Sequence, residues 1–572
     1  MGNIKKSKNN NKGHIPASGN QSFPLIYKIL LAVVLVLTLI VFSNTLKNDF
    51  IVNWDDDGYV LNNPTIQHLD KASVKEIFSS FHMGNYHPLT TLTYAIEYDK
   101  FKVNPKPYHC INLILHLLNV ILVFFFVKGL TKKNLAALIT CALFAIHPMH
   151  VESVAWISEL KDVLYTFFFL LSLMLYTRFS EKNKLSLYFI SLVMFFLSLL
   201  SKSAAVVLPL VLLLIDYYQN KKTDIKNLLL KVPFFLLAIL LGIIALKSQD
   251  AQAQHLTPNY SLFNSFFVAS YALGFYILKF FIPIQLSAFY PHPVMTGSTL
   301  PIIYYLSPLI IAGFIYLTFR IIKEKKLILF CLLFLFVTIA LVLQFFPVGG
   351  AVVADRYTYV PYIGLAFLLA VYAEKIYLSQ KNKQSKLTVV FLVIVLFCSV
   401  LSFNRNSVWA NGVVLFDDVI EKQPDAFYAY HSRGIAYYYT GNYTESLKDY
   451  NKAIELNNTY GLTFYNRGLT QMMLKQYEEA SQSFSRTIEL IPTHDQAYND
   501  RAIARYNLNK FVDAINDYSK SIELNPQNPR AFYNRGVTYF RVNDMENSCA
   551  DWHKASELGL KQANDLYVKH CK

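Results

Sequence analysis

The run LIYKILLAVVLVLTLIVFS at residues 25–43 decides the class of fold, because it is mostly apolar and Lys28 is its one charged residue. A helix that crosses a bilayer needs about 20 such residues. The chain has 572 residues, of which 54% are hydrophobic and 16% charged, and this is too apolar for an ordinary soluble enzyme. We therefore predict an integral membrane protein. Further apolar runs lie near residues 110–128, 135–147, 162–178, 185–200, 203–218, 228–246, 263–285, 301–319, 327–346, 358–374 and 386–403.

The residues before the first apolar run form a basic tail. Residues 1–24 are rich in Lys and Asn and contain no acidic side chain, and no small-residue cleavage pattern follows the run. This predicts an uncleaved anchor with a cytoplasmic tail. The formal net charge is +15, and the basic residues stand in short clusters between apolar runs, where the positive-inside rule places them. We therefore expect no nucleic-acid partner.

The basic clusters also limit the number of crossings. The cluster that ends at Lys226 and the one that begins at Arg320 should face the same side, yet three apolar runs lie between them. One run, in our interpretation within residues 263–300, should therefore be re-entrant or broken, and such backbone borders a cavity or is buried in protein. About 11 crossings would then place the C-terminus outside. The composition, rich in Lys, Asn and Ile, favours a bacterium and its inner membrane.

The sequence after residue 403 repeats with a period of 34 residues. This period indicates tetratricopeptide repeats, in which a small residue lets the first helix of each pair approach an aromatic residue of the second. We assign four repeats and a C-terminal helix to residues 427–572, and a half repeat to 404–426 that leaves a stiff junction. Cys549 and Cys571 could pair, but only outside the cytoplasm. The repeated positions are Arg433-Gly434, Arg467-Gly468, Arg501-Ala502 and Arg535-Gly536, and the aromatics Tyr450, Phe484, Tyr518 and Trp552.

Unusual polar residues gather on the face that should lie outside. With the N-terminus inside, this face includes the loop 44–109 and the turns near residues 147–161, 202 and 347–357. Simpler interpretations stay open, because an acid in a long loop is commonly only solvated, and Lys202 could snorkel instead of binding an anionic head group. His147 and His150 resemble half of a metal site, although Pro148 argues against a regular helix between them.

Several strings, in this order, resemble the transmembrane and tetratricopeptide-repeat glycosyltransferases, a family that includes O-mannosyltransferases. The resemblance implies an all-α fold, with a GT-C-type membrane domain over residues 25–403 followed by the repeat solenoid. It also implies an enzyme that moves a hexose such as mannose from a polyprenyl-phosphate carrier to a Ser or Thr of an exported protein. The strings include FIVNWDDDGYVLNNP (50–64), NYHPLTTLTYAIEYDKF (85–101), ALFAIHPMHVESVAWISELKDVL (142–164) and VVADRYTYVPYIGL (352–365).

The resemblance assigns the catalytic role to Asp55 and Asp56, which occupy the positions of the family's acidic motif. A carboxylate there would take the proton of the acceptor hydroxyl, and a single displacement would invert the anomeric centre. The leaving phosphate needs cations, for which we select Lys161, Lys202 and Arg356. The lipid-linked sugar is the donor, no cofactor is certain, and a divalent metal remains open. Other site candidates are Asp57, His87, His147, His150, Glu152, Asp162, Tyr290, His292, Asp355 and Tyr357.

The repeats admit two interpretations. Their polar side chains could form a ladder that holds an extended acceptor peptide. More simply, the repeated arginines could form ion pairs with acids of the same repeat. Surface pairs of this kind contribute little to stability, so they do not decide the role of the repeats. We expect the repeats to present an acceptor protein to the membrane domain. For the whole protein there are two alternatives: a non-catalytic membrane scaffold, and a lipid-linked glycan transferase or polymerase without a protein acceptor. The ladder residues are Ser432, Asn466, Asp500 and Asn534, and the pairing acids are Asp449, Asp517 and Asp551, with Ser483 breaking the pattern.

Overall fold

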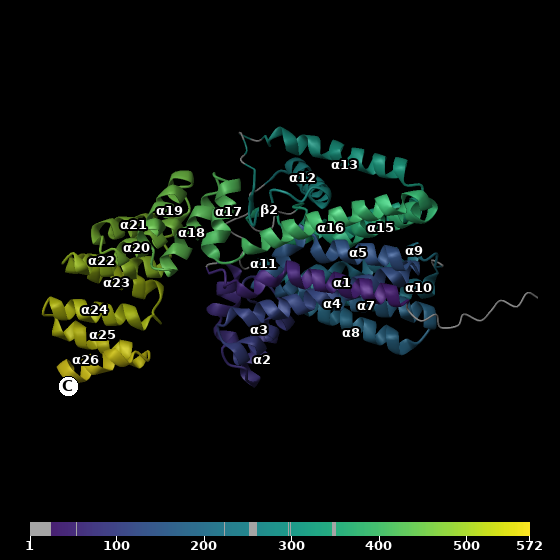
Figure 1. The fold of residues 1–572 in the computed structure, drawn as a ribbon. Coiled ribbons are helices and arrows are strands. Elements are labelled where there is room, and N and C mark those ends of the chain that lie inside the picture. The colour runs from purple at the N-terminus through teal and green to yellow at the C-terminus, as the bar shows by residue number, and fades with distance from the viewer. Residues whose placement is uncertain are drawn as a thin grey trace, which may run out of the picture.

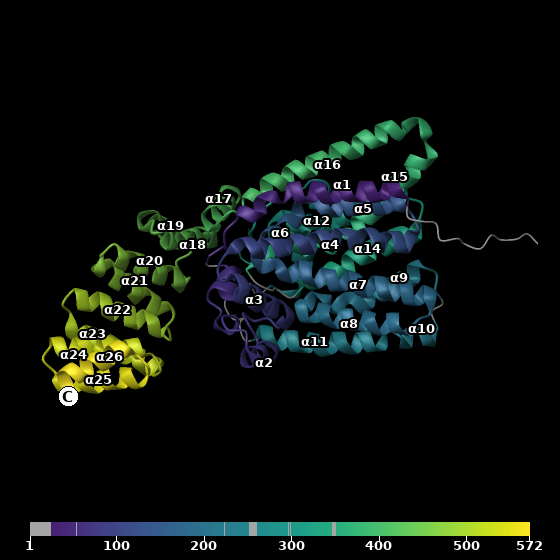
Figure 2. The same ribbon diagram turned by 60° about the horizontal axis from the view of Figure 1, so that its bottom comes forward.

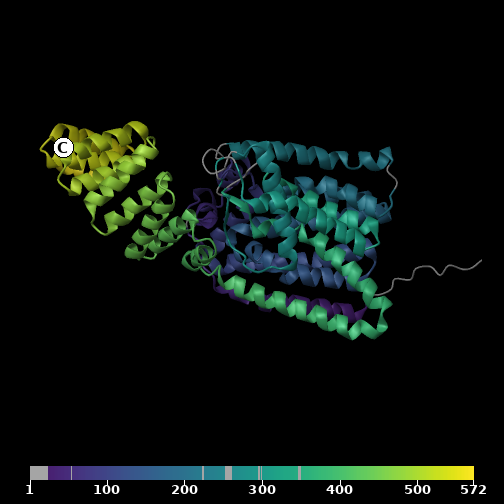
Figure 3. The ribbon, with the colours of Figure 1, turned by 90° about the horizontal axis from the view of Figure 1, so that it is seen from above.

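The computed structural model describes residues 24–572 except 53, 222–223, 251–259, 294, 296, 298 and 346–349. The predicted basic tail thus lies outside the described residues apart from Pro24. The described chain is almost entirely helical, and it forms a bundle of long helices with a solenoid of helix pairs at one end (Figure 1, Figure 3). The predicted all-α class, with membrane helices followed by repeats, is confirmed.

All the apolar runs predicted from the sequence form helices. Nine helices of the described chain are long and apolar enough to cross a bilayer. Helix α5 (Asn134–Ile146) is followed by a 57° bend into residues 148–155, and this broken pair would count as a tenth; α8 (Leu185–Ser201) and α9 (Leu208–Tyr218) are shorter. The number of crossings stays a prediction, since length and composition alone do not fix it. The nine contain α1 (Leu25–Val41), α4 (Pro105–Thr131), α7 (Leu160–Lys182), α11 (Val232–Asp250), α12 (Leu262–Phe281), α13 (Ile302–Ile321), α14 (Lys325–Ile339), α15 (Tyr362–Ser379) and α16 (Gln384–Ser407).

Helix α12 lies in the segment predicted to be re-entrant or broken. Just before the helix, the Tyr260 hydroxyl lies 3.1 Å from Nδ1 of His292, and near its other end the carbonyl of Phe280 lies 3.1 Å from Nε2 of His147. His292 follows β1 (Tyr290–Pro291), which pairs antiparallel with β2 (Ala351–Val353) near the solenoid end of the bundle (Figure 1). Each end of α12 therefore contacts a loop. Whether this segment crosses the bilayer stays a prediction.

The long first loop folds into two helices beside the solenoid. Helix α2 (Lys71–Ser79) begins at a capping box, in which the Asp70 carboxylate accepts from the Ser73 amide at 2.8 Å. Helix α3 (Pro88–Phe101) begins with a proline, which suits the first turn because its missing N–H has no helical partner there. Both helices lie at the end of the bundle that faces the repeats (Figure 2).

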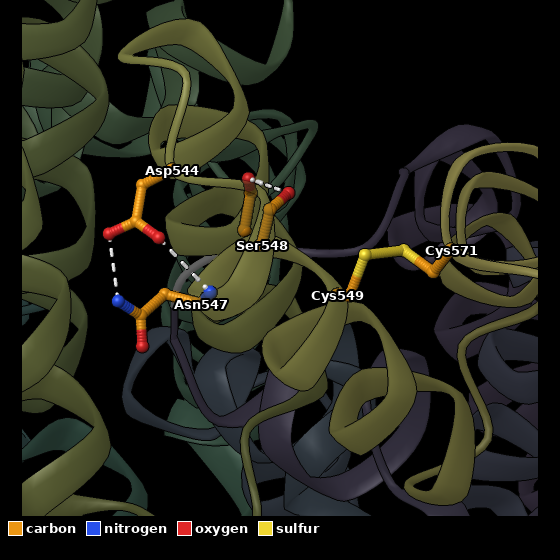
Figure 4. Close-up of a disulfide and its surroundings, with 6 residues drawn as sticks. Asp544, Asn547, Ser548, Cys549 and Cys571 are labelled. Carbon is orange, nitrogen blue, oxygen red and sulfur yellow. Dashed lines mark hydrogen bonds between the residues drawn. A yellow bond between two sulfur atoms is a disulfide. The ribbon is translucent and has the colours of Figure 1, made fainter.

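The solenoid follows directly, because only residues 408–411 separate α16 from α17 (Gly412–Lys422). A Cβ on Gly468 would lie 2.6 Å from the ring of Phe484, so the small residue admits the aromatic residue, as predicted. A disulfide joins Cys549 to Cys571 and ties the last two helices together (Figure 4). The remaining helices are α18 (Phe427–Tyr439), α19 (Tyr443–Leu456), α20 (Gly461–Met473), α21 (Tyr477–Leu490), α22 (Asp495–Asn507), α23 (Phe511–Leu524), α24 (Pro529–Arg541), α25 (Met545–Glu557) and α26 (Lys561–Cys571).

Candidate active site

The two adjacent acids of the first loop differ completely in environment. Asp56 is fully buried: one carboxylate oxygen accepts from the Ile51 amide at 2.8 Å, and the other accepts from both the amide, at 2.9 Å, and the hydroxyl of Ser158. Burial raises the pKa of Asp56 to about 7. Asp56 therefore anchors the loop to the turn just before α7, and both of its carboxylate oxygens accept hydrogen bonds from the protein.

Asp55 is the acid that remains accessible. Its side chain is 30% exposed, and its carboxylate lies 3.1 Å from Nζ of Lys161. The ammonium of Lys161 also lies 4.9 Å from the centre of the Tyr59 ring, so the lysine is held between an acid and an aromatic face. Of the two acids predicted to be catalytic, only Asp55 can meet a substrate without breaking the anchor that Asp56 provides.

Glu159 lies at the centre of the charged cluster. Its side chain is wholly buried, yet its oxygens lie 3.3 Å from Lys161, 3.6 Å from Lys202 and 3.2 Å from Nε of Arg356. The three cations predicted to bind a phosphate thus converge on one carboxylate from three separate parts of the chain. A buried charge of this kind is stable only when it is paired, and here the pairing fixes the positions of the cations.

Arg356 reaches the cluster from the turn after β2. Its Nη1 binds the Glu152 carboxylate, and its backbone amide donates to the same carboxylate at 3.1 Å. The guanidinium carbon also lies 5.5 Å from the Trp156 ring and 5.0 Å from the Tyr357 ring. Glu152 and Tyr357, both predicted site residues, therefore orient Arg356. With Nη1 and Nε engaged by acids, Nη2 is the nitrogen best placed to bind a further anion.

Lys202 occupies the other side of Glu159, with Asp162 as its second acid. His87 lies close by, and its Nε2 accepts weakly from the Ser203 amide at 3.4 Å. Burial, followed by the positive charges of Lys161 and Lys202, lowers the pKa of His87 to about 3. His87 is therefore a neutral imidazole at neutral pH, and it borders the cations without adding a charge.

A second polar pair lies behind Arg356. The Tyr290 hydroxyl donates to the buried carboxylate of Asp355 at 2.9 Å and accepts from the Ser287 amide at 2.7 Å. Burial raises the pKa of Asp355 to about 7, and Arg405 opposes this effect. Tyr290 and Asp355, both predicted site residues, thus support the turn that carries Arg356.

Three predicted candidates do not join the cluster. Asp57 turns away and accepts from the side-chain amide of Asn62 at 2.8 Å. His147 uses both ring nitrogens locally, on the Phe280 carbonyl and the Met149 amide, while Nδ1 of His150 lies 2.8 Å from a backbone carbonyl. These bonds explain the HPMH string as a structural turn. Within the described ranges, no group of three or more His, Cys, Asp or Glu side chains is arranged to hold a metal ion.

The repeat domain departs from a simple polar ladder. Ser432 is fully buried, and the carboxylate of Asp500 accepts from the Tyr465 hydroxyl at 2.8 Å. Asn466 and Asn534 stay partly exposed. The Ser432 hydroxyl lies inside the repeat, and the binding of a peptide at these four positions stays a prediction. The expected arginine pairs are confirmed: Arg433 binds Asp449, Arg501 binds Asp517 and Arg535 binds Asp551, while Arg467 donates to Ser483 instead.

The selection of site residues from the sequence left out three residues that build the site, although Glu159 lies in the turn 147–161, where unusual polar residues were expected. Glu159 and Ser158 stand in the string ISELKD, and Trp54 directly precedes Asp55. An acid between two apolar stretches is a signal that could have pointed to Glu159, because such a charge must find a partner. The sequence offers no comparable signal for Ser158 or Trp54, whose roles depend on which distant segment packs against them.

Two parts of the chain match known families. Residues 89–248 match the dolichyl-phosphate-mannose-protein mannosyltransferase family, and residues 434–475 and 504–543 match the tetratricopeptide repeat. The Caenorhabditis elegans protein O-mannosyl-transferase F38B6.6 is 24% identical over 459 residues, which cover 75% of this chain and 63% of the relative. Human protein O-mannosyl-transferase TMTC1 is 32% identical over 149 residues, which cover 24% of this chain and 16% of the relative. The chain thus spans less than two thirds of the length of these relatives.

Among solved structures, the similarity is distant. The crystal structure of MamA shares 21% identity and a TM-score of 0.26, covering 27% of this chain and 89% of MamA. The tetratricopeptide-repeat protein YrrB shares 23% identity and a TM-score of 0.26, covering 34% of this chain and 98% of YrrB.

The fold and the site together define a polytopic membrane protein with a charged cluster at one end of its bundle and a tetratricopeptide-repeat solenoid beside that cluster. Over these parts the chain is similar to proteins named protein O-mannosyl-transferase, so the resemblance predicted from its motifs is confirmed.

Proposed function

We propose that the protein is a membrane glycosyltransferase that moves a mannose-like hexose from a polyprenyl phosphate to a Ser or Thr hydroxyl of an exported protein. The observation that supports this most strongly is the accessible carboxylate of Asp55 beside three cations gathered on Glu159. A transfer of this kind needs a base for the acceptor and positive charge for the leaving phosphate. The mannosyltransferase family match over residues 89–248 agrees with this chemistry.

In the proposed reaction, Asp55 takes the proton of the acceptor hydroxyl as its oxygen attacks C1 of the sugar. The bond between C1 and the phosphate oxygen breaks on the opposite face, so the configuration at C1 inverts. The lipid phosphate leaves with the bonding electron pair. Arg356 binds this phosphate through Nη2, while Glu152 and Glu159 hold the other guanidinium nitrogens. Lys161 and Lys202 add positive charge on either side of Glu159.

The arrangement of the chain supports an extracytoplasmic site. The solenoid lies at one end of the bundle (Figure 1), and Trp54, which precedes Asp55 of the cluster, contacts Phe416 of the solenoid. Pro24, which precedes α1, lines a cavity of about 570 Å³ together with Lys128, Lys132 and Arg178. Basic residues of this kind mark the cytoplasmic side, so we place the site and the repeats on the other side. There the repeats can recruit an acceptor protein, and the disulfide between Cys549 and Cys571 can persist.

The direct test is transfer of labelled mannose from a polyprenyl phosphate to an acceptor protein by the purified full-length chain in liposomes. Asp55→Asn should lower the rate by about 10²–10⁴-fold, the usual contribution of a general base. Asp57→Asn is the matched control, because its carboxylate lies outside the cluster and its loss should change the rate little. Full activity of Asp55→Asn would overturn the assignment, and labelling of lipid-linked glycans without any protein product would favour a polymerase.

A further inference from the structure

We propose that the half repeat 404–426 at the start of the solenoid belongs to the active site, where Phe416 of α17 and Trp409 just before α17 position the loop that carries Asp55. This inference rests on the proposed role of Asp55. The two aromatic residues touch no substrate and act through Trp54, so they are positioning residues. The solenoid would then set the geometry of the reaction in addition to recruiting an acceptor.

The first support is an aromatic cluster centred on Trp54, the residue before Asp55. The Trp54 ring lies 4.6 Å from Trp156, 6.2 Å from Trp409 and 5.5 Å from Phe416, measured between ring centres. Trp156 and Trp409 are also in contact, at 5.5 Å. The Trp156 ring lies beneath the guanidinium of Arg356 at 5.5 Å, so the same cluster supports both the proposed base and the proposed phosphate ligand.

The second support is the place of Phe416 in the repeat pattern. Phe416 stands 34 residues before Tyr450, so it occupies the position whose aromatic side chain fills the groove within a repeat. It is 1% exposed and belongs to the same apolar core as Ala429 of α18. Here, however, the residue also contacts Trp54 of the membrane domain. One side chain therefore belongs to both the solenoid and the catalytic loop.

Backbone and ionic contacts hold α17 on the segments around the site. The Asp49 amide donates to the Ala410 carbonyl at 2.8 Å, which fixes the start of the Asp55 loop. Lys422, at the end of α17, donates to the Leu286 carbonyl at 2.6 Å. Asp418 binds Arg405 of α16 at 2.6 Å.

These contacts reach the phosphate side of the site as well. Leu286 is followed by Ser287, whose amide donates to the Tyr290 hydroxyl, and that hydroxyl donates to Asp355 beside Arg356. On the next helix of the solenoid, Tyr428 stacks on Phe289 with ring centres 5.4 Å apart. The first helices of the solenoid therefore hold both the segment that carries Asp55 and the segment that supports Arg356.

The expected consequence is a loss of turnover that greatly exceeds any loss of binding. A displacement of about 1 Å in a catalytic group can lower a rate about 10²-fold. Phe416→Ala removes a ring from the support of Trp54 while leaving every charged residue of the cluster in place. We therefore expect its kcat for transfer to fall by about 10²-fold, with little change in the KM for the lipid-linked donor.

The test compares Phe416→Ala with Trp552→Ala in the full-length protein. Trp552 is a buried aromatic residue at the same position of the last repeat, so its loss removes the corresponding ring of the solenoid far from the site. Besides kcat and KM, hydrogen exchange of the amides of residues 54–62 should speed up in Phe416→Ala and stay unchanged in Trp552→Ala. If Phe416→Ala does not fold, Trp409→Phe, which keeps an aromatic ring, takes its place, with the same but smaller changes in kcat and in hydrogen exchange. Phe416→Tyr, which keeps the ring of Phe416, should restore the rate of transfer.

The outcomes separate this inference from the proposed function. Unchanged exchange and unchanged kcat in Phe416→Ala would overturn the positioning role, as would equal effects in Trp552→Ala. If the wild-type protein transfers no sugar, yet exchange of residues 54–62 rises only in Phe416→Ala, then the proposed function is wrong and the structural coupling stands.

Discussion

Replacing Glu159 with glutamine removes the charge on which the three cations converge, while keeping the shape of the side chain. Its oxygens lie 3.2 to 3.6 Å from Arg356, Lys161 and Lys202. Removing one partner of a buried ion pair costs about 3–5 kcal/mol, because the other charge stays buried and uncompensated. Each cation here keeps a second acid, respectively Glu152, Asp55 and Asp162, so we expect about 3 kcal/mol, at the lower end of that range.

The assay is equilibrium unfolding of the purified protein in detergent, together with donor binding. Glu159→Gln should lower the free energy of unfolding by about 3 kcal/mol and weaken donor binding by about tenfold, because the cations no longer share one fixed position. Glu76→Gln is the matched control: this exposed glutamate of the first loop should change stability by less than about 0.5 kcal/mol. If Glu159→Gln matched that control in both measurements, the idea that Glu159 organises the site would be refuted.

Four further predictions, on three residues, concern stability. Asp56→Asn turns an amide NH₂ toward a backbone N–H and should destabilise the fold by about 1–3 kcal/mol, seen in thermal unfolding. Burial raises the pKa of Asp56 to about 7, so the folded protein holds the carboxyl proton of Asp56 more tightly than the unfolded chain does. The contribution of Asp56 to the free energy of unfolding should therefore fall as the pH rises from about 4 to 7. A pH series of unfolding measurements should lose this dependence in Asp56→Asn. Gly468→Ala places a Cβ against the Phe484 ring and should cost about 1–3 kcal/mol, whereas an unchanged melting curve would contradict the tight contact. Cys549→Ser opens the loop closed by Cys571 and should destabilise the last repeat by about 3 kcal/mol, which protease resistance of the C-terminal helix would report.

The sequence predicts the helices and the repeats well because both depend on local periodicity. An apolar run of bilayer length forms a helix whatever its neighbours are, and the 34-residue period fixes which small residue meets which aromatic, as at Gly468 and Phe484. The Cys549–Cys571 disulfide could also be predicted from the sequence, since these two cysteines lie outside the apolar runs.

The details of the site depend on contacts between distant segments, and for these the sequence was less informative. Asp55 and Asp56 are adjacent and chemically identical, so only the burial of one against Ser158, about 100 residues away, separates an accessible acid from an anchor. The same holds for Glu159, whose partners include Lys202 and Arg356. The burial of Ser432 likewise depends on how neighbouring helices pack, which the repeat pattern alone does not give.

A structure with the lipid-linked sugar bound would show directly whether Asp55 and the three cations on Glu159 form the active site. We predict that a phosphate oxygen lies within about 3 Å of Nη2 of Arg356, with C1 of the sugar facing the Asp55 carboxylate. Lys161 should keep its place between Asp55 and Glu159. A phosphate bound at the opposite end of the bundle would show that the active site lies elsewhere, and a sugar that faces away from Asp55 would exclude Asp55 as the base.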